Sequence, residues 1–99
     1  MKKGFVYILT NKPKGVLYVG VTSDIENRIG IHSLNKNNSF VAKYKLYKLV
    51  HLEEFSSIEE AVRREKQIKN WHRNWKINLI ETNNPKWDNL LLDSETSSK

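Results

Sequence analysis

Tyrosines and charged side chains occur at positions where they could act together on a phosphate group. Tyr7 and Tyr18 each lie in a short apolar segment near the start of the chain, and Arg28 follows ten residues after the second tyrosine. Further along, Glu65 interrupts the apolar positions of a helical pattern. A phenol can help to activate water, a guanidinium can stabilise charge on phosphate, and a carboxylate can hold a divalent metal ion. If the fold brings them into one pocket, these groups could hydrolyse a phosphodiester.

The chain of 99 residues carries a net charge of +6 and contains no cysteine. This length predicts a single domain with one modest core. The positive charge suits a nucleic-acid partner, and a well-solvated lysine-rich surface is the alternative explanation. The absence of cysteine excludes disulfides and cysteine-bound zinc. No apolar stretch approaches the roughly 18 residues of a membrane span, and no signal-peptide pattern is present, so we expect a cytoplasmic protein without a membrane partner.

The first two elements that must position these groups are strands. Residues 5–10 and 16–21 are rich in Val, Ile, Leu and Tyr and are joined by a polar turn that contains proline, which predicts a hairpin. A four-residue loop would place Tyr7 directly across from Tyr18, on the same face. A five-residue loop would place the two tyrosines on opposite faces. The residues alone leave both registers open.

Further elements follow from capping and periodicity. The sequence predicts, in order, a helix from the capping box at 23–26 to about residue 34, a strand over 44–55, a helix from a second capping box at 57–60 to about residue 71, and a helical segment around 73–81. Pro85 should end the last segment, and Trp87 should fold back onto the domain. We expect the folded domain to span 1–92 and residues 93–99 to form a flexible tail.

Glu65 is the odd residue of the second predicted helix. The apolar face of this helix includes Ile58 and Ile68, and position 65 belongs to the same face. Burying an unpaired carboxylate is costly, so Glu65 must have a partner or line a cleft. One interpretation is a salt bridge to Lys69 or Arg28, and the other is a functional carboxylate in a site.

The first predicted helix has a similar polar edge. Ile25 and Ile29 mark its inner side, and Arg28 and His32 lie one turn apart beside them. A histidine at such a position is more often a satisfied core residue than a catalytic group. Two helices that each present a charged residue toward the sheet nevertheless indicate a shared polar pocket, which the hairpin tyrosines would complete.

Basic residues gather around Glu65 and after it. They are Arg63, Arg64, Lys66, Lys69, Arg73 and Lys76, with Trp71 and Trp75 among them. Cations of this kind suit phosphate contacts, and interleaved aromatic rings suit base stacking. We expect some of the cations to bind nucleic acid. For the two tryptophans we favour a place in the core.

These motifs together resemble the GIY-YIG nuclease family, above all its small stand-alone bacterial members. The resemblance rests on Phe5-Val6-Tyr7, Tyr18-Val19-Gly20, Thr22-Ser23-Asp24, Arg28, His32 and Arg64-Glu65-Lys66-Gln67, and it covers roughly residues 4–88. It implies an α/β (α+β) fold in which helices flank a three-stranded antiparallel sheet. It also favours the four-residue register, with both tyrosines in the site.

The resemblance implies a role for each matching residue. Tyr7 and Tyr18 would lie beside the attacked phosphate, where one of them deprotonates or orients the water. Which tyrosine does so stays open, because family members differ. Arg28 would stabilise the charge that develops on phosphorus. His32 would assist the water or hydrogen-bond a tyrosine.

Metal binding and the last site residue are also implied by the resemblance. Glu65 would bind a single Mg²⁺ or Mn²⁺ ion, and Asn84 is the nearest candidate for a late asparagine that often completes the site. Three positions depart from the family pattern, and one of them, Val19 in place of isoleucine, is conservative. Phe5 stands where the family has glycine, and Val21 stands where some relatives have a lysine that assists catalysis.

The sequence and the resemblance together predict a metal-dependent endonuclease acting on DNA; DNA is favoured over RNA as the substrate, and the residues alone leave both open. A chain of this size leaves no room for a separate recognition domain, so the enzyme should read the backbone or the structure of its substrate, or be targeted by a protein partner. The alternative is a non-catalytic basic nucleic-acid-binding module. A third interpretation is a protein whose basic face meets an acidic partner.

Overall fold

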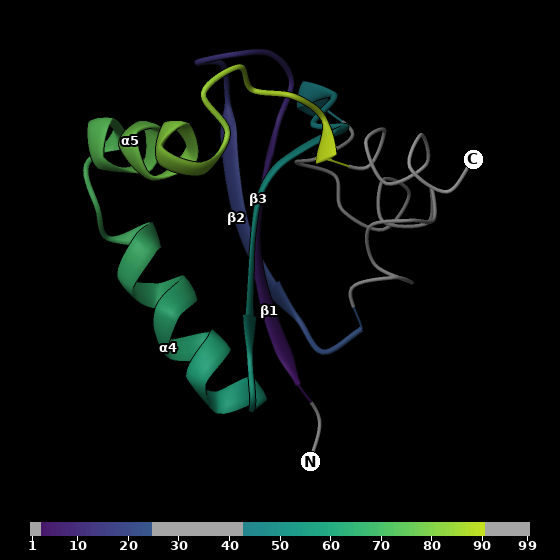
Figure 1. The fold of residues 1–99 in the computed structure, drawn as a ribbon, viewed down its shortest axis with the longest axis vertical. Helices are drawn as coiled ribbons and strands as arrows, with labels where there is room; N and C mark the ends of the chain where they lie inside the picture. The colour runs from purple at the N-terminus through teal and green to yellow at the C-terminus, as the bar shows by residue number, and fades with distance from the viewer. Residues whose placement is uncertain (1–2, 25–42, 91–99) are drawn as a thin grey trace.

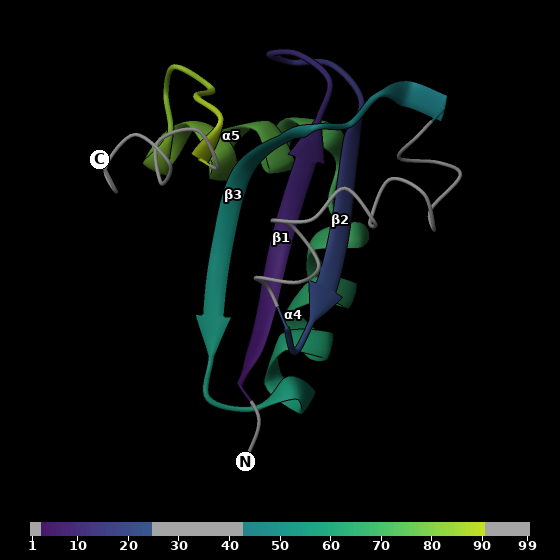
Figure 2. The same cartoon turned by 90° about the vertical axis from the view of Figure 1, so that its right-hand side faces the viewer.

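The computed structural model describes residues 3–24 and 43–90, which form a sheet layer and a helix layer (Figure 1). The elements are β1 (Gly4–Thr10), β2 (Leu17–Thr22), β3 (Lys48–Phe55), α4 (Ile58–Lys69) and α5 (Arg73–Asn83). The strands are antiparallel in the order β2-β1-β3. Both helices lie on one side of the sheet, as the two views show (Figures 1 and 2). The expected three-stranded antiparallel sheet with flanking helices is thus confirmed.

β1 is the central strand and is buried on both faces because its side chains alternate between two hydrophobic clusters. Val6 and Ile8 belong to the cluster that α4 and α5 cover. Tyr7 and Leu9 belong to a second cluster on the opposite face, which also contains Leu46 and Leu49. The tyrosine face and the helix face of the sheet are therefore separate environments.

The hairpin register differs from both predicted registers. Tyr7 pairs with Gly20, and Tyr18 pairs with Leu9, so the loop spans the six residues 11–16. A four-residue loop was therefore the wrong prediction. Compared with that register, the second strand is displaced by two residues, and a displacement by two preserves the face. The two tyrosines lie on the same face, but they are diagonal neighbours and not directly opposed.

Local hydrogen bonds account for the longer loop. The Asn11 side-chain oxygen accepts from the Val16 N–H at 3.0 Å, and the Thr10 hydroxyl donates to the Lys12 carbonyl at 2.9 Å. The Gly15 N–H donates to the same carbonyl at 2.9 Å, and Lys14 adopts a left-handed φ of 58°. These contacts close a turn inside the connection, so the strands begin to pair outside it.

The third strand is shorter than predicted. It begins at Lys48 and not at residue 44, because residues 43–44 are helical and Lys45 takes a φ of 56°, which interrupts an extended chain. Leu46 is nevertheless buried in the tyrosine-face cluster. The first predicted helix lies outside the described residues beyond Asp24, as does the predicted tail.

The second capping box is confirmed. The Ser57 hydroxyl accepts from the Glu60 N–H at 3.3 Å and begins α4, which ends at Lys69. Acidic residues occupy the first turn of α4, and Lys66 and Lys69 occupy its last turn, as the helix dipole favours. Neither helix of the two described ranges combines the length and apolar character that crossing a membrane requires.

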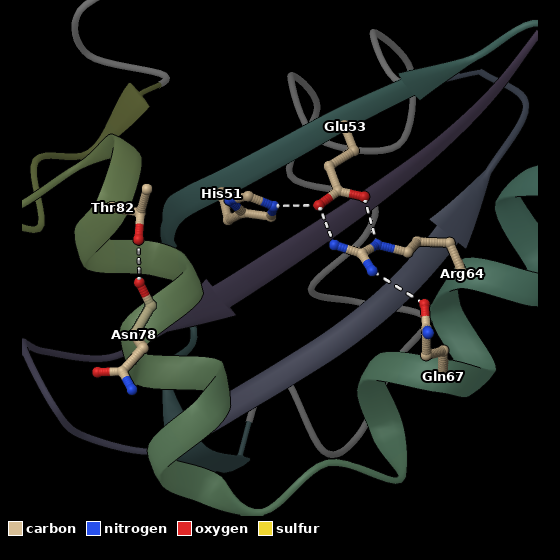
Figure 3. A network of polar contacts seen from close by, with 6 residues as sticks. All are labelled: His51, Glu53, Arg64, Gln67, Asn78 and Thr82. Atoms are coloured by element: carbon tan, nitrogen blue, oxygen red, sulfur yellow. Dashed lines mark hydrogen bonds and ion pairs between the residues drawn. The ribbon is translucent and has the colours of Figure 1, made fainter.

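A polar network ties α4 to β3 (Figure 3). His51 Nε2 lies 2.8 Å from one carboxylate oxygen of Glu53, and Arg64 donates to both oxygens of that carboxylate at 2.9 and 3.1 Å. Arg64 also donates to Gln67 at 2.9 Å and lies 5.1 Å from the centre of the Trp71 ring. His51 is buried and Glu53 is partly buried. The network therefore fixes the position of α4 over the sheet.

Asn84 fixes the chain beyond α5. Its side-chain amide donates to the carbonyls of Val50 and Asp88 at 3.1 and 2.9 Å, and its oxygen accepts from the Asp88 N–H at 3.0 Å. Trp87 folds back into the core at 3% exposure, as predicted, and its indole N–H donates to Glu81 at 2.8 Å.

Removing the Asn84 amide should destabilise the fold. Asn84→Ala leaves the buried Val50 carbonyl without this partner, and we expect a loss of about 1–3 kcal/mol in the free energy of unfolding. Asn83→Ala is the matched control, because Asn83 is exposed and should cost less than about 0.5 kcal/mol. Urea denaturation measures both. Equal effects of the two substitutions would contradict this role for Asn84.

Glu53 should make stability fall in acid. Partial burial by itself raises the pKa of Glu53, but hydrogen bonds from His51 and Arg64 outweigh it and lower the pKa from 4.5 to about 2. A lowered folded-state pKa contributes stability that is complete above pH 4.5 and is lost as the pH falls toward 2. Denaturation of Glu53→Gln between pH 3 and 7 should therefore show a shallower acid decline than wild type, from a lower value at neutral pH.

The exposed neighbour Glu54, paired with Lys3 at 2.7 Å, supplies the control. Glu54→Gln should keep the acid decline of the wild type. An unchanged decline in Glu53→Gln would show that the network does not hold Glu53 ionised.

Candidate active site

The phenol ring of Tyr7 lies directly over Gly20 of the neighbouring strand. A β-carbon at position 20 would meet the ring carbon Cζ and the phenol oxygen of Tyr7 more closely than real β-carbons approach any atom. Glycine at position 20 is therefore required for this placement. Tyr7 is 2% exposed, and the centre of its ring lies 6.3 Å from that of Tyr18, with 41° between the ring planes. The structure brings the two predicted tyrosines together.

Tyr18 also lines an open cleft. It lies on β2, the outer strand of the described sheet on that side, and the cleft walls are Leu17, Tyr18, Val19, Lys69 and Lys76. The two lysines come from α4 and α5, so the cleft joins the edge of the tyrosine strand to the helix layer. Sequence analysis identified the lysines as basic residues but not their place beside Tyr18.

Glu65 is linked to this cleft by an ion pair with Lys69. Its side chain is only 14% exposed, and its carboxylate lies 2.9 Å from the Lys69 ammonium one turn away. The salt bridge to Lys69 that we considered as an alternative is therefore present. Because Lys69 lines the cleft with Tyr18, the carboxylate is connected to the cleft by one ion pair.

Whether Glu65 could hold a metal ion depends on which other ligand atoms would be available to that ion. Within 3–24 and 43–90, no group of three or more histidine and acidic side chains lies close enough to bind a metal together. Mg²⁺ commonly keeps several waters and takes one or two carboxylates plus substrate phosphate as ligands. One partly buried carboxylate, paired with a lysine of the cleft wall, fits that mode of binding, and the ammonium of Lys69 would have to leave the oxygen that it now contacts.

The other predicted site residues are not brought to this cleft by the contacts described. Arg28 and His32 lie outside the described residues. Asn84 is buried and bonded to Val50 on β3, whereas Tyr18 is on β2 across the central strand. A catalytic role for Asn84 stays a prediction.

The predicted nucleic-acid-binding cations fall into two groups. Arg64 and Lys69 are engaged with Glu53 and Glu65, and Arg73 donates to the carbonyls of the β1–β2 turn, at 2.6 Å for Gly15. The remaining three are Arg63 and Lys66, which are exposed, and Lys76, which lines the cleft.

The prediction that both tryptophans lie in the core is wrong for Trp75. Trp71 is partly buried against the helix-face cluster, but Trp75 is 56% exposed. Ile80, which is fully buried, and Ile77 mark the inner face of α5. Trp75 lies outside that face and contacts the rings of Trp71 and His72.

Comparison with known proteins agrees with this arrangement. Residues 3–78 match the family model of the GIY-YIG catalytic domain. A UPF0213 protein of Staphylococcus haemolyticus is 40% identical over 81 residues, which is 82% of this chain and 98% of that protein. A UPF0213 protein of Syntrophus aciditrophicus is 40% identical over 84 residues, covering 84% of this chain and 95% of that protein.

A solved structure supports the same assignment. The solution NMR structure of a UPF0213 protein from Bacillus halodurans is 32% identical and aligns with a TM-score of 0.58, covering 89% of this chain and 93% of that one. The tyrosines on one face of a three-stranded sheet, the glycine beneath Tyr7 and these matches along most of the chain lead to one conclusion: this protein belongs to the GIY-YIG nuclease superfamily.

Proposed function

We propose that this protein is a divalent-metal-dependent endonuclease that hydrolyses phosphodiester bonds of DNA and selects its substrate by backbone or structure. The observation that carries the proposal is the pair of tyrosines on one face, with Tyr7 held against Gly20, in a chain of the GIY-YIG superfamily. The open cleft beside Tyr18, with two lysines in its walls, offers a place for a polyanionic strand.

The tyrosines would serve the attacking water. Tyr18 lies at the cleft, and the buried ring of Tyr7 lies next to it on the same face of the sheet, with 6.3 Å between the ring centres. One phenol accepts or orients the proton of the water, which increases its nucleophilicity. Arg28 stabilises the negative charge that develops on the phosphate, and His32 assists the water or orients a tyrosine. These last two roles rest on the family resemblance.

Glu65 would hold the metal ion. When bound, Mg²⁺ or Mn²⁺ supplies positive charge that polarises the phosphate and stabilises the leaving oxygen. Glu65 is held in position by burial on α4 and by Lys69. Once the carboxylate no longer pairs with it, the Lys69 ammonium is available to a phosphate in the cleft, together with Lys76. Asn84 remains a candidate for orienting the substrate or a site residue.

Substitution of Glu65 tests the proposal. Labelled branched, single-stranded and duplex DNA are incubated with Mg²⁺ or Mn²⁺, and Glu65→Gln should lower the cleavage rate by at least about 100-fold. Glutamine retains an oxygen that can accept from Lys69, so the fold should be preserved. Glu59→Gln is the matched control, because Glu59 is an exposed glutamate of the same helix and its variant should cleave like wild type.

Other outcomes would contradict the proposal in different ways. Equal cleavage by wild type and Glu65→Gln would show that Glu65 serves only as the partner of Lys69. No cleavage by wild type with either metal, combined with binding that weakens steeply with salt, would favour the non-catalytic nucleic-acid-binding module.

A further inference from the structure

An open groove on α5 has no part in the proposed catalysis. Its lining residues are Trp71, Trp75, Asn78, Leu79 and Thr82. Positions 71, 75, 78 and 82 follow one another at helical spacing, so the groove runs along the outer side of α5 from the α4–α5 junction. Trp75 is the most exposed large hydrophobic residue of the described ranges, at 56%. Two tryptophans and a leucine in one groove offer a ligand an aromatic and apolar surface.

The aromatic rings of this groove are held by their neighbours. The centres of the Trp71 and Trp75 rings are 5.8 Å apart with 69° between the planes, and His72 meets Trp75 at 6.5 Å and 81°. Both neighbours thus contact Trp75 in edge-to-face geometry. Trp71 is in turn covered by Arg64, which Glu53 fixes. A ring positioned in this way loses little conformational entropy when a ligand stacks on it.

A polar side chain of the groove, Asn78, could form hydrogen bonds with the edge of a planar ligand that stacks on Trp75. Asn78 is exposed, and its side-chain amide offers one acceptor and two donor hydrogens. The Thr82 hydroxyl donates to the Asn78 backbone carbonyl at 2.8 Å, which leaves the Asn78 side chain unused by that contact (Figure 3). An asparagine amide can form paired hydrogen bonds with the edge of a nucleobase.

The charge around the groove favours an anion. None of the lining residues is charged, but Lys76 follows Trp75 on α5 and lines the neighbouring cleft. Arg73 is bonded to the β1–β2 turn, and the acidic Glu81 of α5 accepts from the Trp87 indole. α5 has no acidic residue in its first turn, and the His72 side chain does not cap it. The nearest acidic residues of α4 and β3 that the contacts identify, Glu65 and Glu53, are neutralised by Lys69 and Arg64.

We propose that this groove binds an unpaired nucleobase of a DNA strand, with the base stacked on Trp75, its edge on Asn78 and the adjoining phosphate toward Lys76. An apolar protein surface would suit Trp75 and Leu79, but it would leave the exposed Asn78 amide without a partner. A nucleotide matches the aromatic, polar and cationic groups at once. The inference rests on the proposed function only because it takes DNA as the ligand.

The test compares a short single-stranded oligonucleotide with an abasic strand of the same length. Fluorescence anisotropy in EDTA measures binding without cleavage. Wild type should bind the base-containing strand about 5- to 100-fold more tightly than the abasic strand. Trp75→Ala should abolish this preference and leave the affinity for the abasic strand unchanged, whereas Trp75→Phe should retain part of it. Tyr47→Ala is the control, because Tyr47 is 48% exposed and does not line the groove.

Several results would overturn the inference. They are equal affinity of wild type for the two strands, an unchanged preference in Trp75→Ala, and no binding of either strand at low salt. A loss of self-association in Trp75→Ala with unchanged DNA affinity would instead assign the groove to a second copy of the chain. The proposed nuclease activity is judged separately by cleavage in Mg²⁺, so the groove can fail while that activity stands.

Discussion

The ring of Tyr7 leaves the central strand and crosses the backbone of Gly20 on β2, where a single added carbon would collide with it. Because β1 is buried on both faces, a shift of Tyr7 would disturb the tyrosine-face cluster directly and, through the strand, the cluster beneath α4 and α5. The same contact sets the position of the phenol relative to Tyr18. One steric constraint thus links the register of the hairpin, the core and the candidate active site.

A charge pair adds to the apolar contacts that position the helix layer over this sheet, and a second pair lies within α4 itself. Glu53 and Arg64 join β3 to α4, while Glu65 and Lys69 lie on the same helix at the cleft beside Tyr18. The first pair is structural, and its lowered carboxylate pKa reflects that. For the second pair, the proposed function implies an exchange of partners, since a metal ion and the Lys69 ammonium would compete for the Glu65 carboxylate. Substrate phosphate could then receive the displaced cation.

The sequence was sufficient to predict the succession of the described strands and helices along the chain, the capped start of α4 and the placement of both tyrosines on one face of the sheet. It could not predict the register, because hydrogen bonds within the turn, such as that from Val16 to Asn11, decide where pairing starts. Face sharing survived the error because side chains alternate with a period of two. Trp75 was misassigned because the phase of a short helix determines which of several apolar residues faces inward, and α5 buries Ile80 instead. The salt bridge between Glu65 and Lys69 could be considered from the sequence because residues four apart on a helix are neighbours.

The most direct test of the account removes one oxygen atom at a time from the tyrosine pair. Tyr7→Phe and Tyr18→Phe keep the aromatic rings, including the packing of residue 7 against Gly20, so both variants should still fold and bind DNA in EDTA. The account predicts that at least one of the two variants cleaves DNA at least about 100-fold more slowly than wild type at saturating Mg²⁺. Cleavage at the wild-type rate by both variants would show that the phenols do not take part in the chemistry.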